Sequence, residues 1–148
     1  MAHARQQIRE AVIAKIQAIG IANAKVMKAR TNRVDPVDGP VLIVFAPQEQ
    51  IDVSAMGSTP PLDRTLSISL EAYVKGDVDI EDDLDDLAVD IETAFGSDPK
   101  LGGLIKSIRL TSTESDIGGG SEQRAANMQM VYEVRYRTKS DQPSILIQ

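Results

Sequence analysis

The helix signal of this chain lies in Leu84-Asp-Asp-Leu-Ala-Val-Asp-Ile-Glu-Thr-Ala-Phe95, which Gly96-Ser-Asp-Pro-Lys-Leu-Gly-Gly-Leu104 follows at once. Apolar residues recur there at the spacing of one helix face: Leu84, Leu87, Ala88, Ile91, Ala94 and Phe95. Acidic residues fall on the opposite, solvated face: Asp85, Asp86, Asp90 and Glu92. Gly96 suits the left-handed position after a helix end, and Pro99 prevents continuation. The stretch predicts an amphipathic helix that ends sharply before a turn and a strand.

Residues on both sides of this helix predict the elements that it packs against. A first helix is indicated by Ile8, Ala11, Val12, Ile16 and Ile19, with Gly20 as its end. Thr65 to Val74 and Met128 to Tyr136 alternate apolar and polar residues, which is typical of strands with one solvated face. Two helices with an apolar stripe and several strands with one apolar face can bury these surfaces against each other in a two-layer sandwich.

We therefore predict a single α+β domain over residues 1–148, with two helices packed on one face of a mixed, mainly antiparallel sheet of four to five strands. Residues 47–63 and 114–126 lack apolar periodicity, and they are predicted to be long flexible loops. Residues 139–148 are predicted to be a tail whose apolar tip, Ile145 to Ile147, docks on a neighbour.

Catalytic and cofactor-binding patterns are absent from the sequence. There is no cysteine, and the single histidine, His3, stands beside the N-terminus, so thiol or histidine catalysis and histidine metal clusters are excluded. Asp77-x-Asp79-x-Glu81 resembles the start of a calcium loop, but Asp82 stands where that loop needs glycine. Gly118-Gly-Gly-Ser121 lacks the lysine of a phosphate-binding loop. We expect no enzyme activity, no cofactor and no metal.

Membrane and nucleic-acid partners are also not expected. The longest apolar run, Val41 to Ala46, is far shorter than the roughly 18 residues of a membrane-spanning helix. The net charge is −6, and aromatic residues make up 3% of the chain without a basic stripe between them, so no sequence-specific binding of nucleic acid is expected.

Charge is segregated along the chain. Residues 76–99 contain ten acids and no Lys or Arg, whereas residues 1–33 contain seven bases and one acid. Acids at the start of the second helix favour its N-terminus, and the others can simply be solvated. Alternatively, the acidic and basic segments meet between copies of the chain in a head-to-tail contact. The candidate contact residues are Arg30, Arg33, Arg64, Asp82, Asp86 and Asp90.

The order of these segments resembles that of a known family. The segments are the His3–Arg9 helix start, the Arg33-Val-Asp-Pro36 bend, the strands Val41–Phe45, Arg64–Glu71 and Tyr132–Thr138, the Pro47–Asp52 loop start, and the acidic helix with its Asp98-Pro-x-Leu-Gly-Gly-Leu104 turn. This arrangement runs over most of the chain and resembles the tail terminator proteins of long-tailed phages, including the minor tail protein U type.

The resemblance implies a structural virion protein that assembles with itself into a ring, a hexamer in that family. Such a ring caps the tail tube, stops its polymerisation and presents the surface for head joining. The implied partners are the tail tube protein and the head–tail connector or neck proteins. The implied locations are the virion tail and, during assembly, the host cytoplasm. Two alternatives remain open: another neck or tail-completion protein, and a small-molecule-binding or regulatory α+β module.

Overall fold

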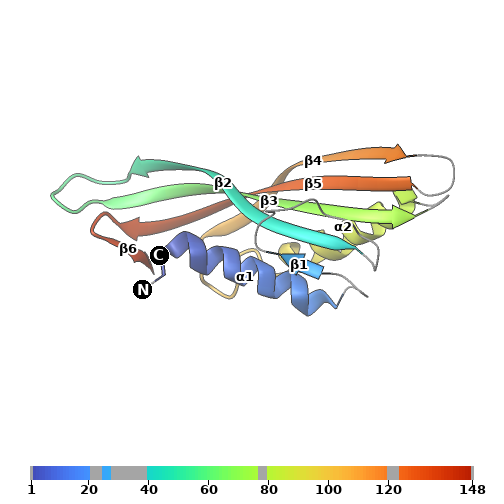
Figure 1. The fold of residues 1–148 in the computed structure, drawn as a ribbon. Helices are drawn as coiled ribbons and strands as arrows, with labels where there is room; N and C mark the ends of the chain where they lie inside the picture. The colour runs from blue at the N-terminus through green and yellow to red at the C-terminus, as the bar shows by residue number, and fades with distance from the viewer. Residues whose placement is uncertain (1, 21–24, 28–39, 77–79, 120–123, 148) are drawn as a thin grey trace.

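The computed structural model describes residues 2–20, 25–27, 40–76, 80–119 and 124–147 (Figure 1). In chain order its elements are α1 (Ala4–Ile19), β1 (Lys25–Met27), β2 (Val41–Val53), β3 (Pro61–Gly76), α2 (Ile80–Gly96), β4 (Ser107–Gly119), β5 (Arg124–Lys139) and β6 (Gln142–Ile147). The predicted α+β class is confirmed.

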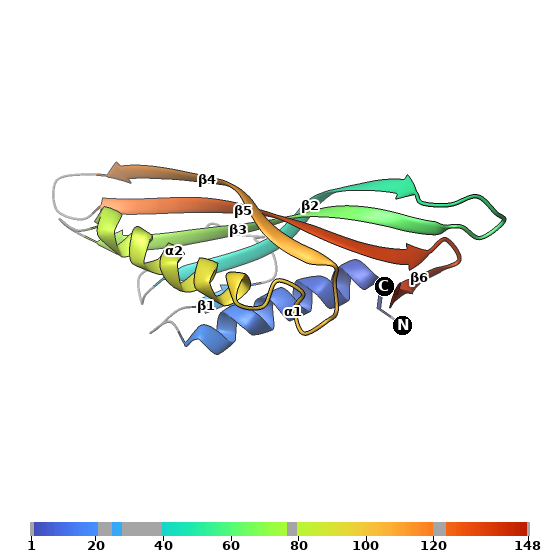
Figure 2. The ribbon, with the colours of Figure 1, turned by 180° about the vertical axis from the view of Figure 1, so that it is seen from behind.

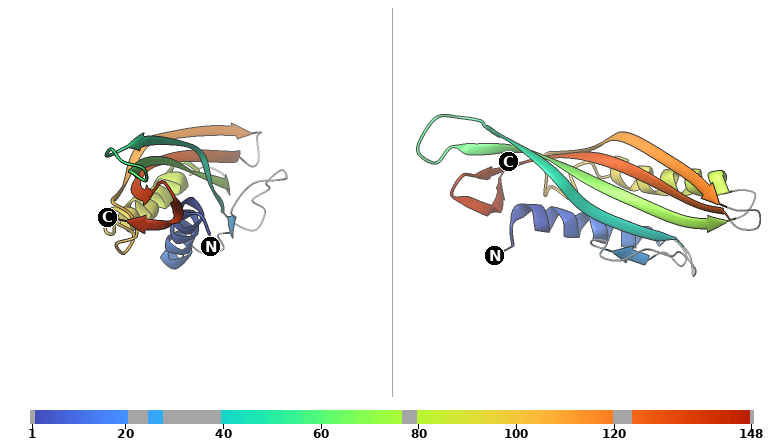
Figure 3. Two further views of the ribbon diagram at one scale, coloured as in Figure 1. Left: turned by 90° about the vertical axis from the view of Figure 1, so that its left-hand side faces the viewer. Right: turned by 45° about the horizontal axis from the view of Figure 1, so that its top comes forward.

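The strands form one twisted, open sheet (Figures 1 and 3). Its order is β1-β2-β3-β5-β4, and β6 pairs with the end of β5. The short β1 runs parallel to β2, and the other pairings are antiparallel, which confirms a mixed, mainly antiparallel sheet. The path has five strands, within the predicted four to five, and β6 is an addition that the sequence did not predict.

Both helices lie on one face of this sheet, as predicted (Figures 2 and 3). We call that face the inner face and the opposite one the outer face. The helices bury Ala4, Ile8, Val12, Ile13 and Ile16 from α1, and Ile80, Leu84, Leu87, Ile91 and Phe95 from α2. Each large apolar side chain in such a core contributes roughly 1.5–3 kcal/mol relative to an exposed one.

The predicted alternation along β3 and β5 is confirmed. Their inner positions are Leu66, Ile68, Leu70, Ala72 and Val74 on β3, and Met128, Met130, Tyr132, Val134 and Tyr136 on β5, all buried in one hydrophobic core. The ring centroids of Phe95 on α2 and Tyr132 on β5 are 5.0 Å apart. Outer positions of the same strands are mostly polar, so the core lies between the helices and the sheet.

The end of α2 differs from the prediction. Gly96 is the last helical residue rather than a left-handed residue after the helix, because the N–H of Ser97 still donates to the carbonyl oxygen of Thr93 at 3.0 Å. The left-handed backbone comes later, at Leu101 (φ 47°), Gly102 (φ 69°) and Gly103 (φ 93°). Glycine accepts this conformation at little cost, so the Gly102-Gly103 pair is what lets the chain reverse into β4.

The two predicted long loops and the predicted tail were wrong. β2 continues to Val53 and β3 begins at Pro61, so residues 47–63 are mostly a hairpin. Residues 114–119 belong to β4 and 124–126 to β5. Within 139–148, β6 pairs with β5, and Leu146 packs against the core. These segments lack apolar periodicity because neither face is fully covered, yet their backbone groups are paired in the sheet.

Candidate assembly surfaces

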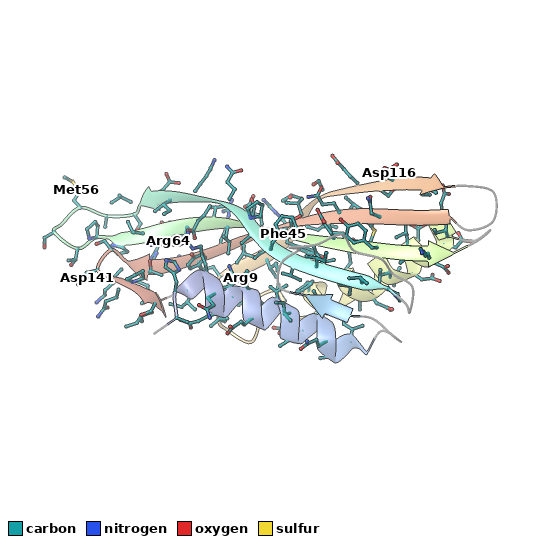
Figure 4. The ribbon with its side chains drawn as sticks, in the orientation of Figure 1. Arg9, Phe45, Met56, Arg64, Asp116 and Asp141 are labelled. Atoms are coloured by element: carbon teal, nitrogen blue, oxygen red, sulfur yellow. The ribbon has the colours of Figure 1, made fainter. Side chains whose placement is uncertain are left out.

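The β2–β3 hairpin projects beyond the start of α1. We call residues 48–66 the arm. Figures 1 and 4 show it reaching past the helix layer, with Met56 at its tip. Met56 is 100% exposed, Val53 65% and Ile51 48%. Exposed large apolar side chains gathered on one projecting element are typical of surfaces that bind another protein.

A bulge in β2 sets which arm side chains face inward. The pairing with β3 shifts between Phe45 and Gln48, so two residues of β2, Ala46 and Pro47, interrupt the ladder. Before the shift, the even-numbered residues of β2 face inward. After it, Ile51 lies opposite Arg64, which occupies an inner position of β3, so the odd-numbered residues of β2 face inward. Without the bulge, Ile51 and Val53 would point to the outer face. The bulge therefore places both apolar side chains on the side of the helices, but beyond their end.

A buried charged cluster holds the base of the arm. The Glu49 side chain is 5% exposed, and its Oε2 accepts from Arg64 Nη1 at 3.2 Å and from Arg5 Nη1 at 3.1 Å. Its Oε1 accepts a hydrogen bond from the Tyr136 hydroxyl. Arg64 Nε donates to Thr138 Oγ1 at 3.0 Å. One carboxylate thereby joins β2, β3, β5 and α1.

Arg64, a predicted contact with a partner, is buried within the subunit, and the contact with a partner stays a prediction. Its side chain is 7% exposed, and its guanidinium lies 6.0 Å from the centroid of the Tyr136 ring (Figure 4). Arg64 precedes Leu66 and Ile68 by two and four residues, so the same alternation that placed those residues in the core also places Arg64 on the inner face. That signal was present in the sequence. The role of Glu49 as its counterion was not, because the bulge reverses the faces of β2.

Burial and a neighbouring charge keep Tyr136 protonated. Burial, and after it the carboxylate of Glu49, raise the pKa of the Tyr136 phenol well above its ordinary value. The hydroxyl therefore remains a donor to Glu49 at physiological pH. Burial also raises the pKa of Tyr132, and its hydroxyl has no hydrogen-bond partner among the described residues.

His3 caps α1 beside this cluster and provides a pH-dependent prediction. Its Nδ1 accepts the backbone N–H of Arg5 at 3.0 Å. Burial, followed by the charges of Arg5 and Arg64, lowers the pKa of His3 from 6.5, while Glu49 opposes the shift. The His3 imidazole therefore binds a proton more tightly in the unfolded chain than in the folded protein. The contribution of His3 to the free energy of unfolding is complete above pH 6.5 and is lost as the pH falls through the lower pKa of the folded state.

We expect the melting temperature of the wild type to fall relative to that of His3→Asn between about pH 7.5 and about pH 5, because asparagine caps a helix without titrating. Thermal unfolding of both proteins across this pH range measures the difference between their melting temperatures. The titration of all other groups affects both proteins equally, so it cancels in this difference. A constant difference would contradict the assignment.

The turn after α2 is tied to α1. Asp98 Oδ1 accepts the backbone N–H of Gly102 at 2.9 Å, and its Oδ2 lies 3.2 Å from Lys15 Nζ. The Gly102 N–H, and after it Lys15, lower the pKa of Asp98. Part of the charge segregation along the chain is thus matched within one molecule, since Lys15 belongs to the basic segment and Asp98 to the acidic one.

The other predicted contact residues divide into two groups. Asp82, Asp86 and Asp90 are exposed on α2, as the helix pattern predicted, and they form no ion pair with another described residue. Arg30 and Arg33 lie outside the described residues. The contact between these two groups, in neighbouring copies of the chain, therefore stays a prediction.

The described part of the chain holds no group of three or more His, Cys, Asp or Glu side chains arranged to bind a metal ion. Neither α1 nor α2 is long and apolar enough to cross a membrane.

The comparisons with known proteins found similarity among solved structures only. No family model matches the chain, and no curated protein matches it. A chain in the solved structure titled "Virion of native gene transfer agent (GTA) particle" is similar to it, with a TM-score of 0.34 and 12% identity, over 90% of this chain and 92% of that one. At this identity and TM-score the similarity assigns no function to this chain.

Proposed function

We propose that this chain is a structural virion protein that caps a phage tail tube, stops its polymerisation and provides the surface for head joining. The observation that carries the proposal is the arm, which presents Ile51, Val53 and Met56 to solvent beyond the helix layer. The order of the sequence segments, which resembles that of the tail terminators, supports the same class of protein.

The arm is suited to contact a partner because its base is rigid while its tip is free. Glu49 and Arg64 fix the base through buried, charge-assisted hydrogen bonds, so little conformational entropy remains to be lost there on binding. The exposed side chains of the tip can then bury apolar area against another subunit at roughly 25 cal/mol per Å².

Capping of this kind requires no covalent chemistry. A ring whose one face makes the contacts of the next tube ring, and whose other face lacks them, ends the growth of the tube. The opposite face is then free to bind neck proteins. We propose that the subunits form a ring, a hexamer in the related family, with the tail tube protein as the first partner.

The proposal is tested by removing the apolar side chains of the arm. We expect Val53→Ser/Met56→Ser to lose binding to tail tubes about ten-fold or more while keeping its melting temperature, because both side chains are exposed in the monomer. Val89→Ser on α2 is the matched control, since Val89 is 61% exposed but lies away from the arm. Cosedimentation with tubes of a phage tail tube protein measures binding.

Electron microscopy of tails assembled in the presence of each variant completes the test. Tails of normal length with the wild type, and overlong tails with the arm variant, are expected. Tails of normal length without this protein would contradict tail capping. If the protein then bound head–tail connectors instead, it would be another neck or tail-completion protein.

A further inference from the structure

The outer face of the sheet carries a row of basic residues that the sequence pattern did not reveal. We call it the basic ridge, and it consists of five bases and three acids: Lys106, Arg109, Arg135, Arg137, Lys139, Asp52, Asp63 and Glu133. Five positive and three negative charges give a local net charge of +2, in a chain whose total is −6. The ridge follows β5, because every second residue of a strand faces the same side.

The acids of the ridge neutralise its bases only in part. Asp63 Oδ1 lies 2.6 Å from Arg137 Nε and 3.9 Å from Lys106 Nζ, so Asp63 pairs with two of the bases. Glu133 Oε1 lies 3.0 Å from Arg135 Nε and 3.4 Å from Arg109 Nη2, so two guanidinium groups share one carboxylate. The side chains of Arg135 and Arg109 remain 60% and 68% exposed. A guanidinium has five N–H donors, so most donors of these two arginines can still bind an acceptor from outside.

The exposed side of α2 carries the opposite charge. Its acids are Glu81, Asp82, Asp83, Asp85, Asp86, Asp90 and Glu92, and α2 contains no base. None of these acids forms an ion pair with a side chain in the described part of the chain. The helices cover the inner face of the sheet (Figure 3). The basic ridge lies on the outer face, so one molecule presents the two charges in opposite directions.

The spacing of the two rows also matches. Asp82, Asp86 and Asp90 are four residues apart on a helix, which places them about 6 Å apart along its axis. Arg135, Arg137 and Lys139 are two residues apart on a strand, about 6.8 Å. The mismatch is under about 1 Å per step, which the flexible stems of arginine and lysine can absorb.

We propose that the basic ridge binds the acidic side of α2 from a second copy of this chain. The proposal rests on the proposed function, and it names the contact between neighbouring subunits of the ring. A contact between two different surfaces is head-to-tail, so each subunit can bind one neighbour through its ridge and another through α2. Phosphate groups of nucleic acid are a second class of ligand for arginines, but the net charge of −6 opposes a long polyanion.

The experiment compares two variants of equal total charge. Arg109→Gln/Arg135→Gln removes two positive charges from the ridge, and Lys100→Glu makes the same change in the exposed turn after α2, so both proteins have a net charge of −6 − 2 = −8. Analytical ultracentrifugation, alone and on tail tubes, measures self-association, and circular dichroism checks folding. We expect about ten-fold weaker association for the ridge variant and little change for Lys100→Glu.

Salt provides a second readout. Raising the salt from about 0.05 M to about 0.5 M should weaken association of the wild type much more than that of the ridge variant, because exposed charges are screened over a few ångströms at high salt. Association of the ridge variant equal to that of the wild type at all salt concentrations would overturn the inference and leave the proposed function standing. A wild type that associates with itself neither alone nor on tubes would overturn both.

A charge exchange makes the test specific. Asp86→Lys/Asp90→Lys should assemble as poorly as Arg109→Glu/Arg135→Glu, and the chain that combines all four substitutions should assemble again. Failure of the combined variant, in a protein that remains folded, would contradict direct contact between the two surfaces. Labelled duplex DNA is included at low salt. DNA binding that needs Arg109 and Arg135, with self-association unaffected, would reassign the ridge to nucleic acid and overturn the proposal.

Discussion

Leu87→Asp should leave the protein unfolded at room temperature. Leu87 is 5% exposed and lies on the face of α2 that packs against the sheet. The substitution removes a large apolar side chain from the core and places there a carboxylate without a counterion. An unpaired buried polar or charged group costs several kcal/mol, which is a large part of the 5–15 kcal/mol that typically stabilises a domain. Loss of the far-ultraviolet dichroism of the helices, or of a cooperative thermal transition, measures the effect.

Val89→Asp is the matched control for this prediction. Val89 lies two residues further along the same helix but is 61% exposed, so the same substitution there adds a charge to a solvated side. We expect a change of stability within about 0.5 kcal/mol. A folded Leu87→Asp protein that melts like the wild type would show that the buried face of α2 is assigned wrongly.

Glu49→Ala should destabilise the protein by about 3–5 kcal/mol, because it leaves the buried guanidinium of Arg64 without its carboxylate. The Tyr136 hydroxyl loses its acceptor in the same variant. Urea-induced unfolding measures the free energy, and the arm should become susceptible to proteolysis before the rest of the sheet, since Glu49 is its anchor.

Arg5→Ala provides the comparison for the Glu49 prediction. Arg5 donates to the same carboxylate oxygen, but its side chain is 45% exposed, so its loss should cost less than about 1 kcal/mol. The double variant Glu49→Leu/Arg64→Leu removes both buried charges, and it should be more stable than Glu49→Ala. Equal destabilisation by Glu49→Ala and Arg5→Ala would show that the Glu49–Arg64 pair does not hold the arm.

Secondary structure with a strong apolar period could be predicted from the sequence. The stripe from Leu84 to Phe95 and the alternation along β3 and β5 were confirmed, because one covered face imposes that period on each element. The solvated position of Asp82, Asp86 and Asp90 follows from the same pattern. The sheet could be placed against the helices for the same reason, since each element had one apolar face to bury.

Strands without a covered face could not be predicted. The ends of β2 and β4, and the whole of β6, were not recognised as strands. Neither face of these segments is fully covered by the core, so their sequences lack an alternation of apolar and polar residues. Their backbone hydrogen bonds to β3 and β5 depend on the register of the neighbouring strand. The local amino-acid composition carries no information about that register.

The amino-acid sequence alone specified the helices, the central strands and the class of the fold, because hydrophobic periodicity is a local property. Tertiary structure settled where the charges lie. The bulge at Ala46-Pro47 turned Glu49 towards the inner face, where its carboxylate pairs with Arg64. The antiparallel register of β4 and β5 gathered Arg109 and Arg135 around Glu133. Both arrangements join residues distant in sequence, so they exist only when the sheet has formed.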